Sequence, residues 1–208
     1  MIGVQRLKLN DFLLFPTTTQ GMPTVEATDF IPEKLEAYKA KNKPRTRVEG
    51  ALHFFVDDIR FENLWKFPFR QLNYLQKFQA VCGPDFSLYL DYPQPLKIWN
   101  TYRNRWLSRF WSEQGLTVIP CVSWAEPESF NYCFDGLPQH SVLAIASMGI
   151  SKKDRNSINL LLQGAEVMLE RLKPSTVLVY GEKMKNELQS LNTEDVFRFY
   201  PYYRRGQK

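Results

Sequence analysis

The stretch from Asp154 to Gly181, DRNSINLLLQGAEVMLERLKPSTVLVYG, decides how the chain is expected to fold. Its apolar residues recur every three or four positions as far as Leu172, which is the spacing of a helix with one buried face. Asp154 can cap the start of this helix, and Pro174 stops it. The continuously apolar run that follows is typical of a strand covered on both faces. The stretch therefore predicts one helix–strand unit of a parallel sheet.

The same alternation of helical segments and apolar runs recurs from residue 51 onward. The expected strands are ALHFFVDD, FSLYLDY, TVIPCVSW, SVLAIASMG, STVLVYG and VFRFYPYY. Because each helix returns the chain to start the next strand in the same sense, the strands should be parallel. The predicted class is α/β, with a mainly parallel sheet of alternating βα units in an incomplete or irregular (β/α) barrel-like domain. A doubly wound open sheet is the alternative.

The chain of 208 residues has the length of a single structural domain. Residues 1–50 are rich in turn signals and are expected to form a lead segment that packs on the core, with one short helix at PEKLEAYKA, residues 32–40. Residues 51–208 are expected to form the βα core domain.

The composition indicates the cellular compartment and the type of ligand to expect. The three cysteines lack CxxC spacing, and the sequence shows neither a signal peptide nor a long apolar run, so we expect no membrane association and a cytoplasmic protein of a reducing compartment. A net charge of +5 permits attraction to phosphates where the charge is clustered.

Five blocks of the sequence resemble a known family. They are HFFVDDIRFENLW, DFSLYLDYPQPLKIWNTYRNRW, VIPCVSWAEPESFNYCFDGLP, SVLAIASMG and LKPSTVLVYG, and the resemblance spans roughly residues 45–182. In this order they resemble an uncharacterised family, catalogued as domain of unknown function 4417, that is carried by bacterial phages and mobile elements. The resemblance implies a phage-type protein of the bacterial cytoplasm and supplies no catalytic residues.

Polar or small residues follow each predicted strand. In parallel α/β folds, ligands bind beyond the carboxyl ends of the strands, where the following loops meet. We therefore expect a ligand site at this edge of the sheet. Its candidate ligand-binding residues are Asp57, Tyr92, Arg103, Trp124, Ser147, Tyr180 and Gly181.

Three acidic residues at this edge are candidates for chemistry. Asp58, Asp91 and Glu126 could share general-acid and general-base roles, or Asp58 and Asp91 could hold Mg²⁺ or Mn²⁺. Asp57 and Asp58 should point to opposite faces, so only one of them can look into the site. The alternative is that both are solvated loop carboxylates. His53, inside the first strand, is expected to be a packed, hydrogen-bonded residue.

Arg103 lies within the apolar stripe of the helix PLKIWNTYRNRWLSRFW and should therefore have a partner. Asp57, Asp58 or Asp91 could supply it. An arginine tied to one carboxylate would make that carboxylate structural and would weaken the metal hypothesis.

Two basic segments could bind nucleic acid. Arg45 and Arg47 belong to the run KAKNKPRTR, and Arg204 and Arg205 follow two tyrosines near the end of the chain. Stacking rings and phosphate-neutralising cations are the combination used for single strands, although basic termini are also often simply solvated.

The resulting functional hypothesis is a mobile-element protein that binds a phosphate-bearing ligand, nucleotide or nucleic acid, at the strand carboxyl-terminal face, with metal-assisted hydrolysis as an extension. The alternative is a non-catalytic phage effector that binds and inhibits a host protein. The sequence does not decide whether the protein is an enzyme.

Overall fold

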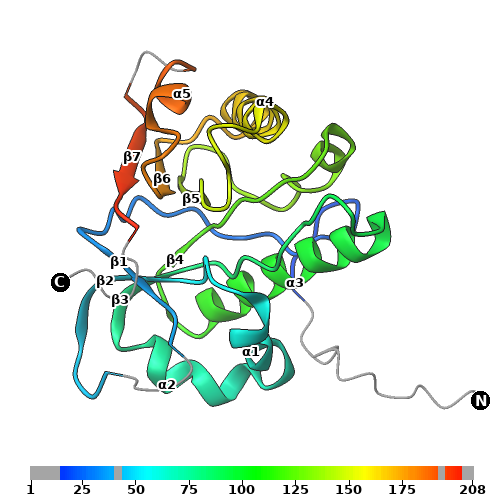
Figure 1. Cartoon of the computed structure of the whole chain (residues 1–208). Coiled ribbons are helices and arrows are strands. Elements are labelled where there is room, and N and C mark those ends of the chain that lie inside the picture. Colours follow the sequence, from blue (N-terminus) through cyan, green and yellow to red (C-terminus); the bar gives the residue numbers. More distant parts are fainter. Residues whose placement is uncertain (1–14, 40–43, 192–194, 203–208) are drawn as a thin grey trace, which may run out of the picture.

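The protein is an α/β structure of parallel strands and covering helices (Figure 1). The computed structural model describes residues 15–39, 44–191 and 195–202. The strands are β1 Leu35–Ala37, β2 Val48–His53, β3 Phe78–Cys82, β4 Val118–Ile119, β5 Val142–Ala146, β6 Thr176–Tyr180 and β7 Phe197–Tyr200. The α-helices are α1 Glu62–Lys66, α2 Leu72–Leu75, α3 Gln94–Glu113, α4 Arg155–Leu172 and α5 Lys185–Gln189. Short 3-10 helices are η1 Asp58–Arg60, η2 Pro68–Gln71 and η3 Pro127–Asn131.

The strands form two parallel sheets, β1-β2-β3-β4 and β5-β6-β7, in sequence order. A parallel bridge between Cys121 and Ala144 joins the two sheets. Parallel pairing is therefore confirmed. Within the described ranges no ladder joins β7 to β1, so no closed barrel forms.

One buried cluster draws residues from all seven strands, and we call it the inner cluster. Its strand members are Leu35, Ala51, Ala80, Cys82, Ile119, Val142, Ala144, Leu178, Tyr180 and Tyr200. Across it, the ring centroids of His53 in β2 and Tyr180 in β6 are 4.0 Å apart. The Tyr200 hydroxyl donates to the Pro32 carbonyl oxygen at 2.5 Å, which ties β7 to the segment before β1. The two sheets thus curl toward each other around a common interior.

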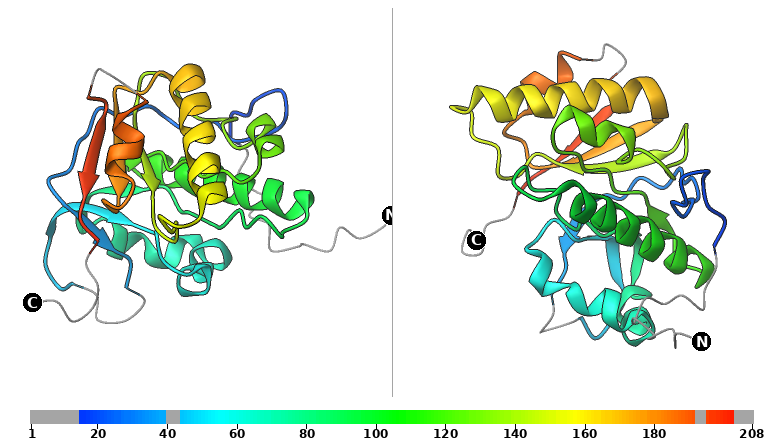
Figure 2. Two further views of the ribbon diagram at one scale, coloured as in Figure 1. Left: turned by 45° about the horizontal axis from the view of Figure 1, so that its top comes forward. Right: turned by 90° about the vertical axis from the view of Figure 1, so that its right-hand side faces the viewer.

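Helices cover the outer faces of both sheets (Figures 1 and 2). α1 and α2 lie beside the four-stranded sheet, α4 and α5 beside the three-stranded sheet, and α3 between them. One outer core lies beneath α1, α2 and α3 and contains the fully buried Trp106 and Trp111. A second lies beneath α4 and α5 and contains Leu161 and Met168. No helix among the described residues is long and apolar enough to cross a membrane.

Helix α4 begins and ends where its sequence dictates. The Asp154 side chain accepts hydrogen bonds from the Asn156 and Ser157 amides, and the C-cap Lys173 has a left-handed conformation with φ 45°. The buried residues of α4 lie on the face predicted from the apolar spacing, so the helix predicted for this stretch is confirmed.

Two local predictions are wrong. The lead segment forms strand β1 where a helix was expected at 32–40, and β1 pairs with β2 from Leu35↔Ala51 to Ala37↔His53. FSLYLDY was expected to be a strand, but it is an irregular segment between β3 and α3, and the strand is β3 itself, Phe78–Cys82. Pairing with neighbouring strands outweighs the local helix preference at β1.

Candidate functional site

All the strands are parallel, so the loops that follow them gather at one edge of the sheets. The adjacent carboxylates after β2 have different surroundings there. Asp57 is exposed, and its carboxylate lies 3.6 Å from the Arg60 guanidinium. Asp58 accepts hydrogen bonds from the Ser87 amide at 3.0 Å and the Ser87 hydroxyl at 2.9 Å. Asp58 thus anchors the segment that follows β3.

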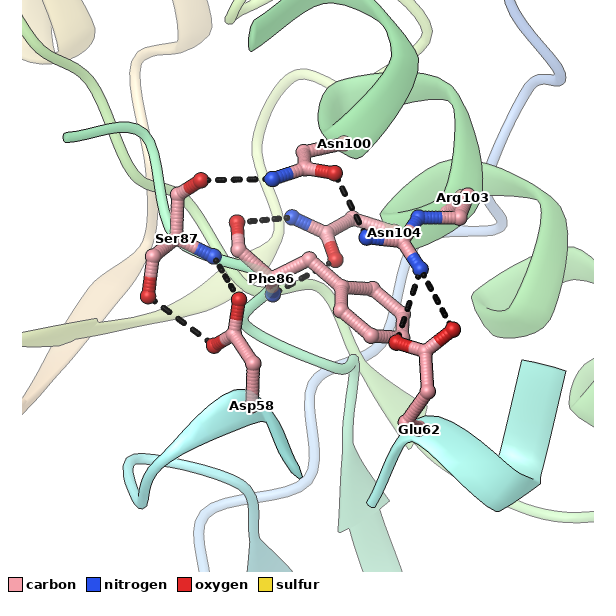
Figure 3. A network of polar contacts seen from close by, with 7 residues as sticks. All are labelled: Asp58, Glu62, Phe86, Ser87, Asn100, Arg103 and Asn104. Carbon is pink, nitrogen blue, oxygen red and sulfur yellow. Dashed lines mark hydrogen bonds and ion pairs between the residues drawn. The ribbon is translucent and has the colours of Figure 1, made fainter. Parts of the chain in front are cut away.

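That segment, which we call the β3–α3 loop (residues 83–93), has backbone groups bonded by side chains (Figure 3). The Phe86 amide donates to Asn104 Oδ1 at 2.9 Å, and Asn104 Nδ2 donates to the Phe86 carbonyl at 3.3 Å. Asn100 Nδ2 donates to the Ser87 carbonyl at 2.7 Å. Helix α3 and Asp58 therefore hold this irregular loop in one position.

Arg103 has a carboxylate partner, but it is Glu62 and not Asp57, Asp58 or Asp91 (Figure 3). The Arg103 guanidinium donates to both Glu62 carboxylate oxygens, at 3.0 and 3.2 Å. It also lies 3.7 Å from the centroid of the Phe86 ring. The arginine therefore ties α3 to α1 and packs on the β3–α3 loop, which is a structural arrangement.

A pocket of about 240 Å³ opens at the carboxyl-terminal ends of β3, β4 and β5. Its lining is largely apolar and comes from the end of β5, from the three loops after these strands and from the first turns of α4. The lining residues are Asp85, Leu88, Leu90, Val122, Ser123, Trp124, Ala125, Ile145, Ala146, Met148, Ile150, Ser157, Leu160 and Leu161. Its position is the one expected for a ligand site in a parallel α/β fold.

Asp85 is the one acidic residue that lines this pocket. Burial raises the pKa of Asp85 to about 7, a hydrogen bond from the Ser123 side chain opposes the rise, and the charge of Asp58 adds to it. Burial also raises the pKa of Asp58, which the hydrogen bonds from Ser87 oppose. Burial in this largely apolar pocket therefore disfavours the ionised form of the Asp85 carboxyl.

The predicted carboxylates lie elsewhere. Asp91 is exposed, and Glu126 pairs with the buried Lys97, whose Nζ lies 2.5 Å from Glu126 Oε2. Neither residue lines the pocket, and nor does Asp58. Within residues 15–39, 44–191 and 195–202, no group of three or more His, Cys, Asp and Glu side chains could hold a metal ion. The predicted carboxylate cluster is therefore not assembled.

Trp124 lines the pocket, as its position after β4 suggested. Its Nε1 donates to the Leu160 carbonyl oxygen at 3.0 Å. The indole lies so close to Gly164 that a Cβ there would be 2.1 Å from Nε1. Trp124 is therefore both a wall of the pocket and a contact between the β4 end and α4.

The other ligand-binding candidates contact neighbouring residues of the protein through hydrogen bonds or ring packing. The Ser147 hydroxyl donates to the Gly181 carbonyl at 3.0 Å, which ties the ends of β5 and β6 together. The Tyr180 ring packs on His53, and the Tyr92 ring packs on Tyr89 at 5.1 Å.

His53 is packed, as expected for a lone histidine in a strand. Its Nδ1 accepts a hydrogen bond from the Phe55 amide at 3.2 Å. Burial lowers the pKa of His53 to about 3, so the imidazole is neutral at physiological pH.

The basic candidates divide between described and undescribed parts of the chain. Arg45 and Arg47 are exposed. Arg204 and Arg205 lie outside the described residues. Nucleic-acid binding by these arginines stays a prediction.

Sequence reasoning missed Asp85. The apolar run FQAVC followed by Gly83 and Pro84 was the available signal, because Gly-Pro marks the end of a strand and places Asp85 at the sheet edge. Because FSLYLDY has an alternating apolar pattern, the strand was predicted there, and its end was placed at Asp91 instead of at Cys82.

Comparison with known proteins identifies relatives among phage proteins. The family described as Domain of unknown function (DUF4417) matches residues 16–200. The Gene 1 protein of Mycobacterium phage D29 is 38% identical over 208 residues, covering 96% of this chain and 74% of that protein. The Gene 1 protein of Mycobacterium phage L5 is 38% identical over 194 residues, covering 90% of this chain and 81% of that protein. No solved structure matches the chain.

Proposed function

The chain belongs to the Domain of unknown function (DUF4417) family, as the match to its residues 16–200 shows. Because that family description gives no function, we propose one from the geometry of the pocket. The protein binds a phosphate-bearing small molecule of the nucleotide type at the carboxyl-terminal edge of its strands. The observation that carries this proposal is the pocket itself, which combines an apolar lining with one ionisable group, Asp85. Small-molecule sites commonly pair an apolar cavity with a few placed polar groups.

Exposed basic residues adjacent in the sequence to lining residues of the pocket supply positive charge for the phosphate. The segment between β5 and α4 contributes Met148 and Ile150 to the lining. Between these residues and α4, the same segment carries the exposed Lys152 and Lys153, and α4 begins with the exposed Arg155. No lysine or arginine lines the pocket. A ring would therefore enter the pocket, while its phosphate stays outside among these cations.

Calorimetric titration with nucleosides and their 5′-monophosphates tests the proposal. We expect the monophosphates to bind more tightly than the nucleosides, and the difference to disappear in a Lys152→Gln, Lys153→Gln variant. The matched control is Lys66→Gln, Lys173→Gln, which removes two exposed lysines, one in α1 and one at the C-terminal end of α4. Absence of binding by all of these compounds would contradict the proposal, provided that the protein is folded by circular dichroism.

Hydrolysis of the ligand is an extension of this proposal. Hydrolysis would take place at the phosphate outside the pocket, and a divalent cation would enter with that phosphate rather than through a carboxylate cluster. We therefore expect Mg²⁺ or Mn²⁺ to raise the melting temperature only in the presence of nucleotide. A rise caused by metal alone would indicate a protein metal site instead.

A second candidate function is the binding of a host protein, and two exposed apolar side chains, Ile59 and Tyr89, favour it. Ile59 is 83% and Tyr89 54% exposed. The Asp58–Ser87 hydrogen bonds hold the segments that carry these residues side by side. Exposed apolar side chains of this kind are often covered by a partner protein. Binding of a host-cell protein by the wild type that is lost in Ile59→Ser, Tyr89→Ser, with nucleotide binding unchanged, would favour this function.

Nucleic acid is the third ligand to test, since Arg45 and Arg47 are exposed on the segment before β2. Phosphate contacts make affinity fall steeply as salt rises. Fluorescence anisotropy with a single-stranded oligonucleotide at several salt concentrations, with Arg45→Glu, Arg47→Glu for comparison, measures this contribution. No binding at low salt would exclude nucleic acid as a direct ligand.

A further inference from the structure

Resting on the proposed binding function, we propose that the ring inserted into the pocket presents two adjacent N–H donors, the pattern of guanine, and that the Asp85 carboxylate accepts both. The phosphate of the same ligand lies at the mouth of the pocket. This assigns a ligand class to the site and a specificity role to Asp85.

The side chains that line the pocket have already used their donors. Trp124 Nε1 donates to the Leu160 carbonyl, and the Ser157 hydroxyl donates to the Asp154 carboxylate. The Ser123 side chain bonds to Asp85. Every other side chain in the lining is apolar. Apart from Asp85 itself, the lining side chains therefore offer no free donor to a ligand, and the ligand must supply the donors.

Asp85 provides the matching acceptors. A carboxylate has two oxygens with about four acceptor positions, and Ser123 occupies one of them. Two neighbouring N–H groups can each reach a separate carboxylate oxygen, which is the bidentate arrangement that such groups prefer. The remaining acceptors of Asp85 therefore fit a donor–donor edge.

Only one common base offers this edge. Guanine carries a ring N–H beside an exocyclic amino group, whereas adenine and cytosine set their amino group beside an unprotonated ring nitrogen. The lone pair of that nitrogen would face the carboxylate. Leu88, Val122 and Leu161 supply apolar walls for the body of the ring. The pocket therefore favours guanine over the other bases.

The Asp85 position is fixed before a ligand binds. The β3–α3 loop, which contains Asp85, is held by Asn104 on the Phe86 backbone and by Asp58 on Ser87. A preorganised acceptor loses little freedom on binding, so a missing donor on the ligand is not compensated by movement of the loop. An unpaired acceptor in an apolar pocket is costly, which makes the donor pattern decisive.

Competitive calorimetry with three monophosphates tests the inference. Guanosine, inosine and adenosine 5′-monophosphates share the same phosphate, but inosine lacks the amino group and adenosine lacks both the ring N–H and the 2-amino group of guanosine. We expect guanosine monophosphate to bind at least about tenfold more tightly than either of the others. Its affinity should also rise between pH 6 and pH 8, because the paired form of Asp85 is the ionised one.

In the Asp85→Asn variant, the ratio of the affinities for guanosine and inosine monophosphates should change, and a purely structural role of Asp85 would leave that ratio unchanged. An amide offers one donor and one acceptor, which fit the ring N–H and the neighbouring carbonyl of guanosine and inosine alike. The preference for guanosine over inosine should therefore collapse to about onefold, while both still bind. Asp91→Asn, a matched change at an exposed carboxylate of the β3–α3 loop, should leave the preference intact.

The outcomes separate this inference from the function on which it rests. If none of the monophosphates binds, the proposed function fails. If all of them bind with equal affinity, or if Asp85→Asn keeps the full preference, nucleotide binding stands and the guanine inference is overturned. Circular dichroism and urea unfolding of each variant exclude loss of fold as the cause.

Discussion

Two segments of the molecule are held in place by different means. In the α4–β6 unit, the backbone groups bond within the helix or to neighbouring strands, and the start of α4 is capped by the residue next to it. In the β3–α3 loop, the Phe86 and Ser87 backbones bond to side chains of Asn104, Asn100 and Asp58. The first segment is held by regular backbone pairing and a local cap, whereas the second depends on individual side chains from distant positions in the chain.

The largest expected effect breaks the side-chain support of the β3–α3 loop. Asn104→Ala leaves the buried Phe86 amide and carbonyl without their partner, and each such group costs about 1–3 kcal/mol. We expect the free energy of unfolding to fall by about 3 kcal/mol in urea titrations.

The matched control for this change is Asn159→Ala, which replaces an exposed asparagine of α4 and should change stability by less than about 0.5 kcal/mol. Hydrogen exchange of the Phe86 amide should also accelerate in Asn104→Ala alone. Equal stabilities of the two variants would show that the loop does not depend on Asn104.

The second prediction concerns the contact between the pocket and α4. A Cβ at Gly164 would lie within 2.4 Å of three atoms of the Trp124 indole. Gly164→Ala should therefore destabilise the protein by about 2 kcal/mol, although alanine in an exposed helix interior stabilises by up to about 1 kcal/mol.

Gln163→Ala, at the exposed neighbouring position, is the control and should be neutral or slightly stabilising. Thermal and urea unfolding measure both variants. A stabilising effect of Gly164→Ala would mean that the indole moves away easily, and that this wall of the pocket is soft.

The contrast between the two segments also explains what the sequence could predict. The period of Leu161, Ala165 and Met168 is a local property, so α4 and the parallel order of the later strands follow from it. Strand β1 has only three residues, and its state is set by pairing with β2, which no local pattern records.

The candidate site was predicted in position but not in composition. The edge of the sheet and Trp124 follow from the rule that ligands bind where parallel strands end. Asp58 also follows a strand, yet it serves Ser87, and Asp85 replaces it in the pocket. Which carboxylate lines the pocket depends on the path of the β3–α3 loop, and that path is held by hydrogen bonds from Asn100 and Asn104 on α3.

The last prediction sharpens the comparison through one carboxylate from each segment. Burial raises the pKa of Asp85 from its ordinary value of 3.8 to about 7, whereas hydrogen bonds from the Ser157 side chain and the Ser157 amide lower the pKa of Asp154. A raised pKa means that the contribution of Asp85 to stability is fully present below about pH 4 and is lost as the pH rises through about 7. A lowered pKa has the opposite sign. The contribution of Asp154 is present above its ordinary pKa and is lost as the pH falls through its folded pKa.

Urea unfolding between pH 3 and pH 8 separates the two carboxylates. Between pH 5 and pH 8, the free energy of unfolding of the wild type should fall by on the order of 1 kcal/mol more than that of Asp85→Asn. The difference is smaller than the pKa shift alone would give, because the Asp85 side chain retains some contact with solvent. Asp154→Asn, which keeps a capping side chain, should follow the wild type over that range and differ from it only below about pH 4. Parallel pH profiles for wild type and Asp85→Asn would mean that the Asp85 carboxyl is as well hydrated as Asp154. The Asp85 carboxyl would then be ionised throughout the neutral range, like Asp154, and a raised pKa would not distinguish the β3–α3 loop from the capped start of α4.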